Sequence, residues 1–407
     1  MRKIYFYPAG RIYSSQWDLI NHPPPGYAFV TDPTGWDKAM SPIVQSDSLY
    51  HPLVSLLGRW VPLHLAKAYV ERFTKRIPRG VDLVYSYNHP VLHRAPWVVH
   101  VEWATALAGF DIRYLRRHAR TIERLLASSW CKKIVTWSEI ARKSILHHLD
   151  CSGFEDKVEL VNLAIGKRDF VKDYSDDRIK LLFVGSVNAP GSHYGYNFHV
   201  KGGKEVLEAF SALARRYDGL ELVMRTAVPP EVKARYAGVP NVRIMDTPIP
   251  REQLDDEWRT ADIFLLPAHQ VTVWGVTLEA MSYELPIIAT DVYANREIVQ
   301  DGVTGLLIGG SERVPYYVEE LVPFGASSRR KEVDAVVAST TDGRMVEELV
   351  DRASRLIESP DLRRRMGKAA RHEVEEGRFS IARRNEKLAR IFDEAVADEA
   401  KGVLTAR

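Results

Sequence analysis

Short apolar runs alternate with segments of helical periodicity along most of the chain. In the first half, the apolar runs predict strands at residues 3–7, 82–87, 97–101, 133–136 and 158–163. Apolar residues at helical spacing predict helices at residues 53–75, 112–126 and 139–149. Residues 13–36, rich in Pro, Gly and aromatic side chains, predict a loop.

The second half repeats this alternation after residues 167–178, a charged stretch without apolar periodicity that we interpret as a linker. The predicted strands are residues 179–184, 220–225, 242–245, 263–266 and 287–289. The predicted helices are residues 202–217, 251–261, 276–283, 344–357, a segment ending at 376, and 381–395. Residues 313–341 predict an irregular insertion.

Strands that alternate with helices predict the α/β class with parallel sheets. We expect two Rossmann-like, doubly wound domains that face a cleft, at residues 1–170 and 178–380, with a helix at 381–407 packing back toward the first. In such domains, ligands bind at the carboxyl ends of the strands. Because the GxGxxG fingerprint and the GxxxxGK[ST] motif are both missing, a dehydrogenase or a P-loop kinase is disfavoured.

Composition agrees with this picture and narrows the function. The 407 residues favour two domains, and 45% hydrophobic with 27% charged residues is ordinary for a globular protein. A net charge of +3 does not by itself indicate nucleic acid. Cys131 and Cys151 show no metal-ligand spacing, which favours a reducing, cytoplasmic compartment. The sequence contains no recognisable signal peptide and no apolar run of membrane-spanning length.

Two strand ends in the second half carry residues suited to phosphate. Gly185 and Ser186 follow the strand at 179–184, and Lys201 with two glycines opens the next helix. A lysine beside free backbone N–H groups at a helix N-terminus makes a phosphate site. The alternative is a solvated lysine beside flexible glycines.

The loop before the helix at 276–283 provides a second group of candidates, Trp274, Gly275, Val276, Thr277 and Glu279. The free amides of this helix N-terminus suit a diphosphate. Glu279 either accepts hydrogen bonds from a ribose diol or only complements the helix dipole.

The second half also contains many short motifs in a characteristic order: FVG, KGG, ADIFLLP, LEAM, IIATD and REIVQDGVTGLL. From residue 180 to residue 379 this order resembles the nucleotide-sugar domain of family-four retaining glycosyltransferases (glycosyl transferases group 1), which have the GT-B fold. The resemblance is weaker in the first half, at the strand ends near Gly10, His89 and Glu102, and it implies that Gly10 contributes to donor binding. It implies a UDP- or GDP-linked sugar donor, no further cofactor and no metal.

The functional positions of the family carry over unevenly. The lysine of its basic pair, which holds the diphosphate, matches Lys201, but Ser186 stands at the position of the arginine. Of two glutamates eight residues apart, the second matches Glu279 and implies a ribose contact, whereas Val271 stands at the first. His269 or Thr272 would then reach the hydroxyls of the sugar. Stretches 225–227 and 245–247 are expected to flank the base.

In the first half, the resemblance places a histidine near the transferred sugar. The matching strand offers Glu102 at its end, with His100 two residues earlier on the same face. We expect Glu102 to stabilise positive charge on the donor ring or to orient the acceptor hydroxyl. For His100, a packed strand histidine is the alternative.

These observations predict a hexosyltransferase that moves a sugar to the hydroxyl of a glycan, lipid-linked or small-molecule acceptor. The basic helix at 113–124 is either a solvated face or a peripheral contact with anionic lipid at the inner face of the membrane. The alternative function is a catalytically inactive, glycosyltransferase-like partner protein that binds a nucleotide or glycan. A nicotinamide-dependent enzyme is a third hypothesis.

Overall fold

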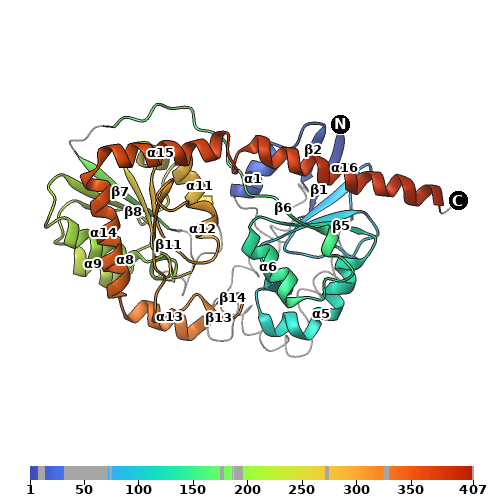
Figure 1. The fold of residues 1–407 in the computed structure, drawn as a ribbon, viewed down its shortest axis with the longest axis horizontal. Helices are drawn as coiled ribbons and strands as arrows, with labels where there is room; N and C mark the ends of the chain where they lie inside the picture. The colour runs from blue at the N-terminus through green and yellow to red at the C-terminus, as the bar shows by residue number, and fades with distance from the viewer. Residues whose placement is uncertain are drawn as a thin grey trace.

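The computed structural model describes residues 1–7, 14–31, 72, 76–174, 178–185, 187, 196–270, 275–323 and 330–405. These residues form two lobes, each built around a six-stranded parallel sheet (Figure 1). The predicted α/β class with two Rossmann-like domains is confirmed. The helix expected at 53–75 lies outside the described residues except for residue 72.

The first sheet has the strand order β2-β1-β3-β4-β5-β6. Its strands are β1 (Arg2–Tyr7), β2 (Tyr27–Thr31), β3 (Leu83–Tyr87), β4 (Trp97–Val101), β5 (Cys131–Thr136) and β6 (Val158–Leu160). The described helices of this lobe are α1 (Ser14–Asn21), α5 (Ile112–Ala127) and α6 (Glu139–His148), with 3₁₀ turns at Ala104–Ala108 and Glu155–Lys157. Most strand residues are buried because helices cover this parallel sheet.

The expected loop at residues 13–36 is wrong for its described part. α1 forms there, and β2 pairs in parallel with β1, Ile4 lying opposite Phe29. The prolines and glycine that suggested a loop fall between the two elements, at residues 23–26, where they make a turn. Pairing with β1 supplies hydrogen bonds that local composition does not reveal.

The second sheet has the order β12-β11-β10-β7-β8-β9. Its strands are β7 (Ile179–Val184), β8 (Leu220–Arg225), β9 (Val242–Ile244), β10 (Ile263–Leu266), β11 (Ile287–Thr290) and β12 (Gly305–Ile308). The helices that accompany it are α7 (Tyr196–Val200), α8 (Gly203–Leu213), α9 (Pro230–Tyr236), α10 (Arg251–Thr260), α11 (Gly275–Ser282), α12 (Asn295–Ile298), α14 (Gly343–Glu358) and α15 (Pro360–Glu375). The chain order reverses beside β7, which places a topological switch point at the centre of the sheet.

The segment expected as an irregular insertion contains regular structure. β13 (Tyr317–Glu319) and β14 (Val322–Pro323) form an antiparallel hairpin, and α13 (Arg330–Ser339) follows. Val333 and Val337 of α13 pack with Val314 in a small separate core. The expectation was wrong because so small an apolar cluster leaves little periodicity in the sequence.

The last helix, α16 (Ile381–Thr405), leaves the second lobe and runs across the first (Figure 1). Its Leu388, Ile391 and Phe392 are buried in one cluster with Ile4 and Phe6 of β1. The chain therefore crosses between the lobes twice. Among the described residues, none of the helices has the length and apolar character needed to cross a membrane.

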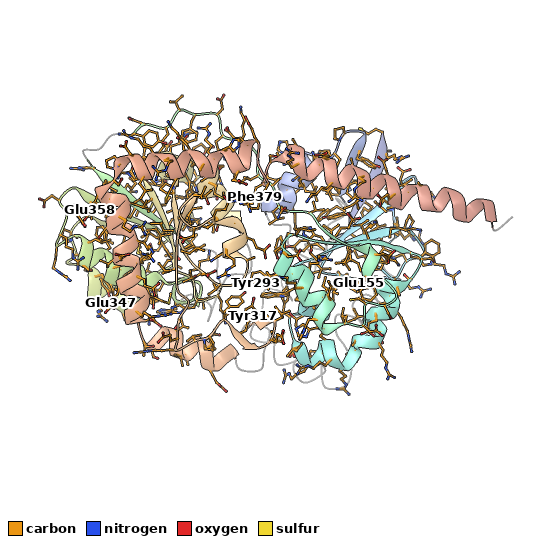
Figure 2. All side chains as sticks on the ribbon, in the orientation of Figure 1. Glu155, Tyr293, Tyr317, Glu347, Glu358 and Phe379 are labelled. Carbon is orange, nitrogen blue, oxygen red and sulfur yellow. The ribbon has the colours of Figure 1, made fainter. Side chains whose placement is uncertain are left out.

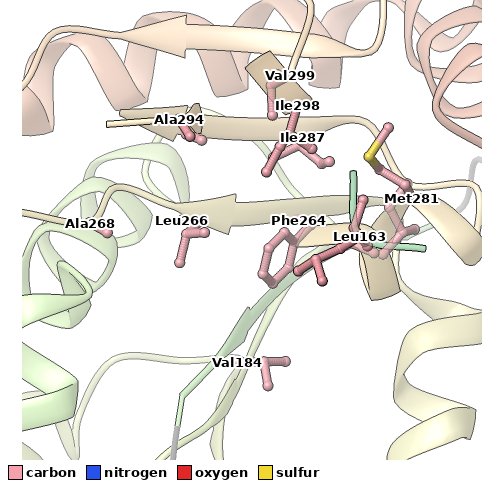
Figure 3. Close-up of a cluster of buried hydrophobic side chains, with 14 of the residues drawn as sticks. Leu163, Val184, Phe264, Leu266, Ala268, Met281, Ile287, Ala294, Ile298 and Val299 are labelled. Carbon is pink, nitrogen blue, oxygen red and sulfur yellow. The ribbon is translucent and has the colours of Figure 1, made fainter. Parts of the chain in front are cut away.

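The two lobes also meet through side chains that follow strand ends. The largest buried cluster, part of which Figure 3 shows around Phe264 and Ile287, continues into the first lobe through Leu163 and Trp137. The carboxylate of Glu297 accepts hydrogen bonds from the backbone N–H groups of Glu139 and Ile140 at the start of α6, at 2.7 and 2.9 Å. It thereby satisfies amide groups that no intrahelical bond can serve.

A second bridge joins Tyr293, which follows β11, to Glu102, which follows β4. The Tyr293 hydroxyl donates to the backbone oxygen of Glu102 at 2.7 Å, and its ring packs against Trp103. Figure 2 shows Tyr293 at the seam between the lobes, near Tyr317 of β13. The carboxyl ends of the two sheets therefore face each other, which is where the sequence predicted a cleft.

Candidate functional site

Lys201 lies between α7 and α8, at the carboxyl side of the second sheet. Gly202 adopts a φ of 81°, and a Cβ there would lie 2.0 Å from the backbone oxygen of Pro267. Only glycine permits this close approach between the start of α8 and the loop after β10. The KGG stretch thus lies directly against the loop that follows β10.

The ammonium group of Lys201 lies in an environment that disfavours its charge. Burial, reinforced by the nearby Arg225 guanidinium, lowers the pKa of Lys201 to about 8. Within the described part of the chain, no carboxylate forms an ion pair with Lys201. A half-buried cation beside another cation is typical of a site that receives an anion.

Gly185 lets the ends of β7 and β8 approach each other. Its N–H donates to the backbone oxygen of Arg225 at 2.7 Å, and a Cβ would lie 2.2 Å from the Thr226 hydroxyl.

Three predicted site residues, Gly10, Ser186 and Trp274, lie outside the described residues, as do Val271 and Thr272.

The other predicted residues of the 274–279 group lie at the start of α11. Gly275 and Val276 are half-buried, and Thr277 is buried. The Thr277 hydroxyl has no hydrogen-bond partner among the described atoms. The first turn of α11 therefore keeps polar groups that a ligand could use.

Glu279 lies in the second turn of α11 and is engaged by two arginines. Its carboxylate accepts a hydrogen bond from Arg251 of α10 and lies 3.8 Å from Arg168 of the segment between the lobes. Burial raises the pKa of Glu279, and these arginines partly offset the effect. The ribose contact stays a prediction, since a diol would share the carboxylate with Arg251.

Sequence reasoning missed both arginines. Arg251 is the first residue of the predicted helix at 251–261, so a basic residue at a helix start was the available signal. Arg168 had no comparable signal, because its position depends on how the segment between the lobes folds back over Tyr283, whose ring lies 5.3 Å from the guanidinium carbon. Arg251 and Arg168, together with Lys201 and Arg225, concentrate positive charge at the carboxyl end of the second sheet.

His269, predicted to reach the sugar, is buried after β10. Its Nε2 lies 3.2 Å from the carboxylate of Glu205 on α8, and its backbone N–H donates to Val200 at 2.8 Å. The same carboxylate accepts the backbone N–H of Asp342, which caps α14. The backbone bond joins the loop after β10 to the end of α7, whereas neither ring nitrogen has a hydrogen-bond partner among the described atoms. Contact with a sugar stays a prediction.

His100 lies on β4 and Glu102 directly follows it, on the same face of the sheet, as predicted. Their surroundings differ. The His100 Nδ1 lies 2.9 Å from the Tyr85 hydroxyl, and burial lowers the pKa of His100 to about 3. Its Nε2 has no partner among the described atoms, and the ring lines an internal cavity of about 20 Å³, enough for roughly one water molecule. This geometry supports a packed, neutral strand histidine.

Glu102 is buried at the seam between the lobes. Its carboxylate accepts a hydrogen bond from the Tyr87 hydroxyl at 2.5 Å, and its backbone N–H donates to the side chain of Asn88. Burial raises the pKa of Glu102 from its ordinary value of 4.5 to about 7, against the opposing effect of Tyr87. Such a carboxyl exchanges protons near neutral pH, as a general acid or base must.

Glu102→Gln is expected to stabilise the protein above pH 7 and to have little effect near pH 4.5. A raised pKa means that the folded protein holds the proton more tightly, so the wild type loses stability as pH rises from 4.5 to 7, by roughly 2–3 kcal/mol. The neutral amide avoids this loss. Thermal unfolding from pH 4.5 to 8 checks it, with the exposed Glu155→Gln on the same lobe as control (Figure 2). A difference in melting temperature that does not grow with pH contradicts the assignment.

The described residues contain no group of three or more His, Cys, Asp or Glu side chains placed to hold a metal ion. Both cysteines are free and buried. The arrangement at the second sheet therefore offers cations, helix-terminal amides and the half-buried carboxylate of Glu279, a set suited to an anionic ligand with hydroxyl groups.

Comparison with known sequences gives a family match within the second lobe. Residues 178–322 match the model of a family described as glycosyl transferases group 1. A D-inositol 3-phosphate glycosyltransferase from Geodermatophilus obscurus is 32% identical over 108 residues, which are 23% of this chain and 24% of that protein. A protein of the same name from Kribbella flavida is 38% identical over 77 residues, 19% of this chain and 18% of that protein. The matched part thus covers about a quarter or less of these relatives.

Solved structures resemble the whole chain in fold. The sucrose-phosphate synthase of Thermosynechococcus elongatus is 13% identical with a TM-score of 0.61, covering 98% of this chain and 100% of that one. HepE of Anabaena, solved in complex with UDP and glucose, is 13% identical with a TM-score of 0.59, covering 97% and 99%. The predicted GT-B arrangement of two Rossmann-like domains is confirmed.

Proposed function

Because the predicted resemblance to group 1 glycosyltransferases is confirmed over residues 178–322, we propose that this protein is a glycosyltransferase that uses a nucleoside diphosphate sugar. The observation that carries the proposal is the half-buried, cationic site around Lys201 at the strand ends. A diphosphate with a ribose and a sugar supplies negative charge for these cations and hydroxyl groups that can donate to the Glu279 carboxylate.

The proposed reaction is retaining transfer of a hexose to an acceptor hydroxyl of a glycan, a lipid-linked sugar or a small molecule. The bond from the anomeric carbon to the diphosphate oxygen breaks, and its electron pair stays on the diphosphate. The acceptor oxygen bonds to the same face of the anomeric carbon, and its proton passes to the departing phosphate oxygen. Lys201 and the amides at the start of α11 stabilise the charge on the leaving group.

Glu102 lies across the seam from this site and would stabilise positive charge on the sugar ring or orient the acceptor hydroxyl. Its bridge to Tyr293 connects it to the loop after β11, on the donor side. His269 would act by holding that side in place through Glu205.

A thermal-shift panel of UDP, GDP, ADP and their sugars tests the proposal. UDP is the first candidate, since the HepE structure of the same fold contains UDP and glucose. Stabilisation by one nucleotide, followed by sugar transfer or donor hydrolysis, supports an enzyme. Binding without any turnover favours the inactive partner protein instead. Retention of activity after EDTA treatment checks the proposed metal independence.

Glu279→Gln is expected to weaken binding of the cognate nucleoside diphosphate by about tenfold, because the amide is a poorer acceptor for the ribose diol. The 2′,3′-dideoxy analogue separates this role from a structural one. Removing the diol should weaken binding to the wild type but cause little further loss in Glu279→Gln. Calorimetry provides the measurement, with the exposed Glu347→Gln on α14 as control (Figure 2). Equal sensitivity of both proteins to the missing diol contradicts the ribose contact.

We also propose that α5 contacts anionic lipid from the cytoplasmic side. Its exposed face carries Arg113, Arg116, Arg117, Arg120 and Arg124. Phe110 before the helix is 40% exposed and Trp130 after it is 38% exposed. Arginines flanked by exposed aromatic rings suit a membrane interface. The free, buried Cys131 and Cys151 fit a reducing compartment.

The protein is expected to co-sediment with vesicles that contain anionic lipid and not with neutral vesicles. Each arginine near such a surface contributes about 1 kcal/mol, so the double variant Arg120→Glu, Arg124→Glu should lose most of the binding. The same substitution at exposed Arg259, on the other lobe, should leave it unchanged. Equal binding of both variants indicates that α5 is only a solvated face.

A further inference from the structure

The guanidinium of Arg225 lies over the end of β7. Arg225 is the last residue of β8 and pairs with Val184, the last residue of β7. Its Nη1 donates to the backbone oxygen of Gly185 at 3.0 Å, while its own backbone oxygen accepts the Gly185 N–H at 2.7 Å. The backbone bond aligns the two strand ends, and the Nη1 bond holds the side chain over Gly185, immediately before residue 186.

Arg225 is near both residues already assigned to the donor. It is near enough to Lys201 to lower the pKa of that lysine, and near enough to Glu279 for the carboxylate to oppose the effect of burial on the pKa of Arg225. Its Nε is buried and finds no hydrogen-bond partner among the described atoms. Two half-buried cations side by side are costly unless an anion binds between them.

We propose that Arg225 is the second cation of the diphosphate site, supplying from β8 the charge that the family places at the position of Ser186. This inference rests on the proposed function and goes beyond it. The sequence predicted that residues 225–227 flank the base, whereas here Arg225 contacts the diphosphate. With Nη1 held by Gly185, the Nε and Nη2 groups remain to form paired hydrogen bonds with phosphate oxygens. Lys201 would contact the diphosphate from the other side.

Calorimetric binding of UDP and of uridine to Arg225→Gln separates a phosphate contact from a base contact. We expect UDP to bind roughly tenfold more weakly or worse, while uridine binds as it does to the wild type. The dependence of UDP affinity on salt should also become shallower. The matched substitution Arg259→Gln, on an exposed helix end, should change neither ligand. If the panel selects guanine, GDP and guanosine replace these probes.

Arg225→Lys guards against loss of folding, since lysine keeps the charge but not the planar pair of donors. We expect this variant to keep the wild-type melting temperature and to bind UDP several-fold more weakly, with uridine unchanged. Unchanged UDP affinity in both variants overturns the inference, and so does an equal loss for UDP and uridine. A wild type that binds no nucleoside diphosphate rejects the proposed function itself, and this inference falls with it.

Discussion

Lys201→Ala is expected to lower the turnover number for sugar transfer by about two to three orders of magnitude while the protein stays folded. Negative charge grows on the diphosphate as the bond to the sugar breaks, so a cation that contacts it stabilises the transition state more than the bound donor. The half-buried environment of Lys201 strengthens this effect, because solvent screens the charge less there than at the surface.

The pH dependence gives this prediction a sharper form. The pKa of Lys201 is lowered to about 8 without ligand, and the protonated form is the one that binds the anionic donor. The ratio kcat/KM reports groups of the free enzyme, so it should fall as pH rises through about 8. Lys201→Arg should keep part of the activity and lose this decline, since arginine stays protonated.

Steady-state kinetics with saturating donor, or donor hydrolysis where no acceptor is known, provide the measurement. Lys368→Ala, an exposed lysine on α15, is the matched control and should retain wild-type rates. A turnover number for Lys201→Ala within about threefold of the wild type would place the leaving-group contact elsewhere.

Gly202→Ala is expected to destabilise the protein by roughly 2–5 kcal/mol, which combines two costs. An L side chain at a φ of 81° costs about 1–2 kcal/mol. Its Cβ would also meet the backbone oxygen of Pro267 at 2.0 Å, so the loop after β10 must shift, at about 1–3 kcal/mol. Because Lys201 is the preceding residue, nucleotide binding should weaken as well.

Thermal or denaturant unfolding measures this effect, and Gly238→Ala serves as control. Gly238 is exposed and has nothing within 4 Å of an added Cβ, so alanine there should be neutral or slightly stabilising. Similar stability of the two variants would show that α8 and the loop after β10 are not in the close contact described.

Much of the architecture follows from local pattern. The predicted strand at residues 220–225 coincides with β8, and the predicted helix at 251–261 differs from α10 by one residue. Strong periodicity in buried elements makes such segments predictable. By contrast, β2 and the hairpin of β13 and β14 were missed, because short strands owe their structure to neighbours distant in the sequence.

The candidate site divides in the same way. Gly202 and Lys201 were identifiable because adjacent residues at a helix start carry their chemistry in sequence order. The engagement of Glu279 by Arg251 and Arg168 was not, since it joins segments that only packing brings together.

The sequence by itself determined that this chain forms two α/β domains with a lysine, glycines and a glutamate at strand ends of the second, because apolar periodicity and helix starts are local properties. Only the tertiary structure decided which charges meet there. Arg225 reaches Gly185 and the vicinity of Lys201 because β7 and β8 lie side by side with their ends in register. Which side chains meet at the carboxyl end of a sheet depends on the order of its strands. The number of residues between two strands in the sequence does not reveal that order.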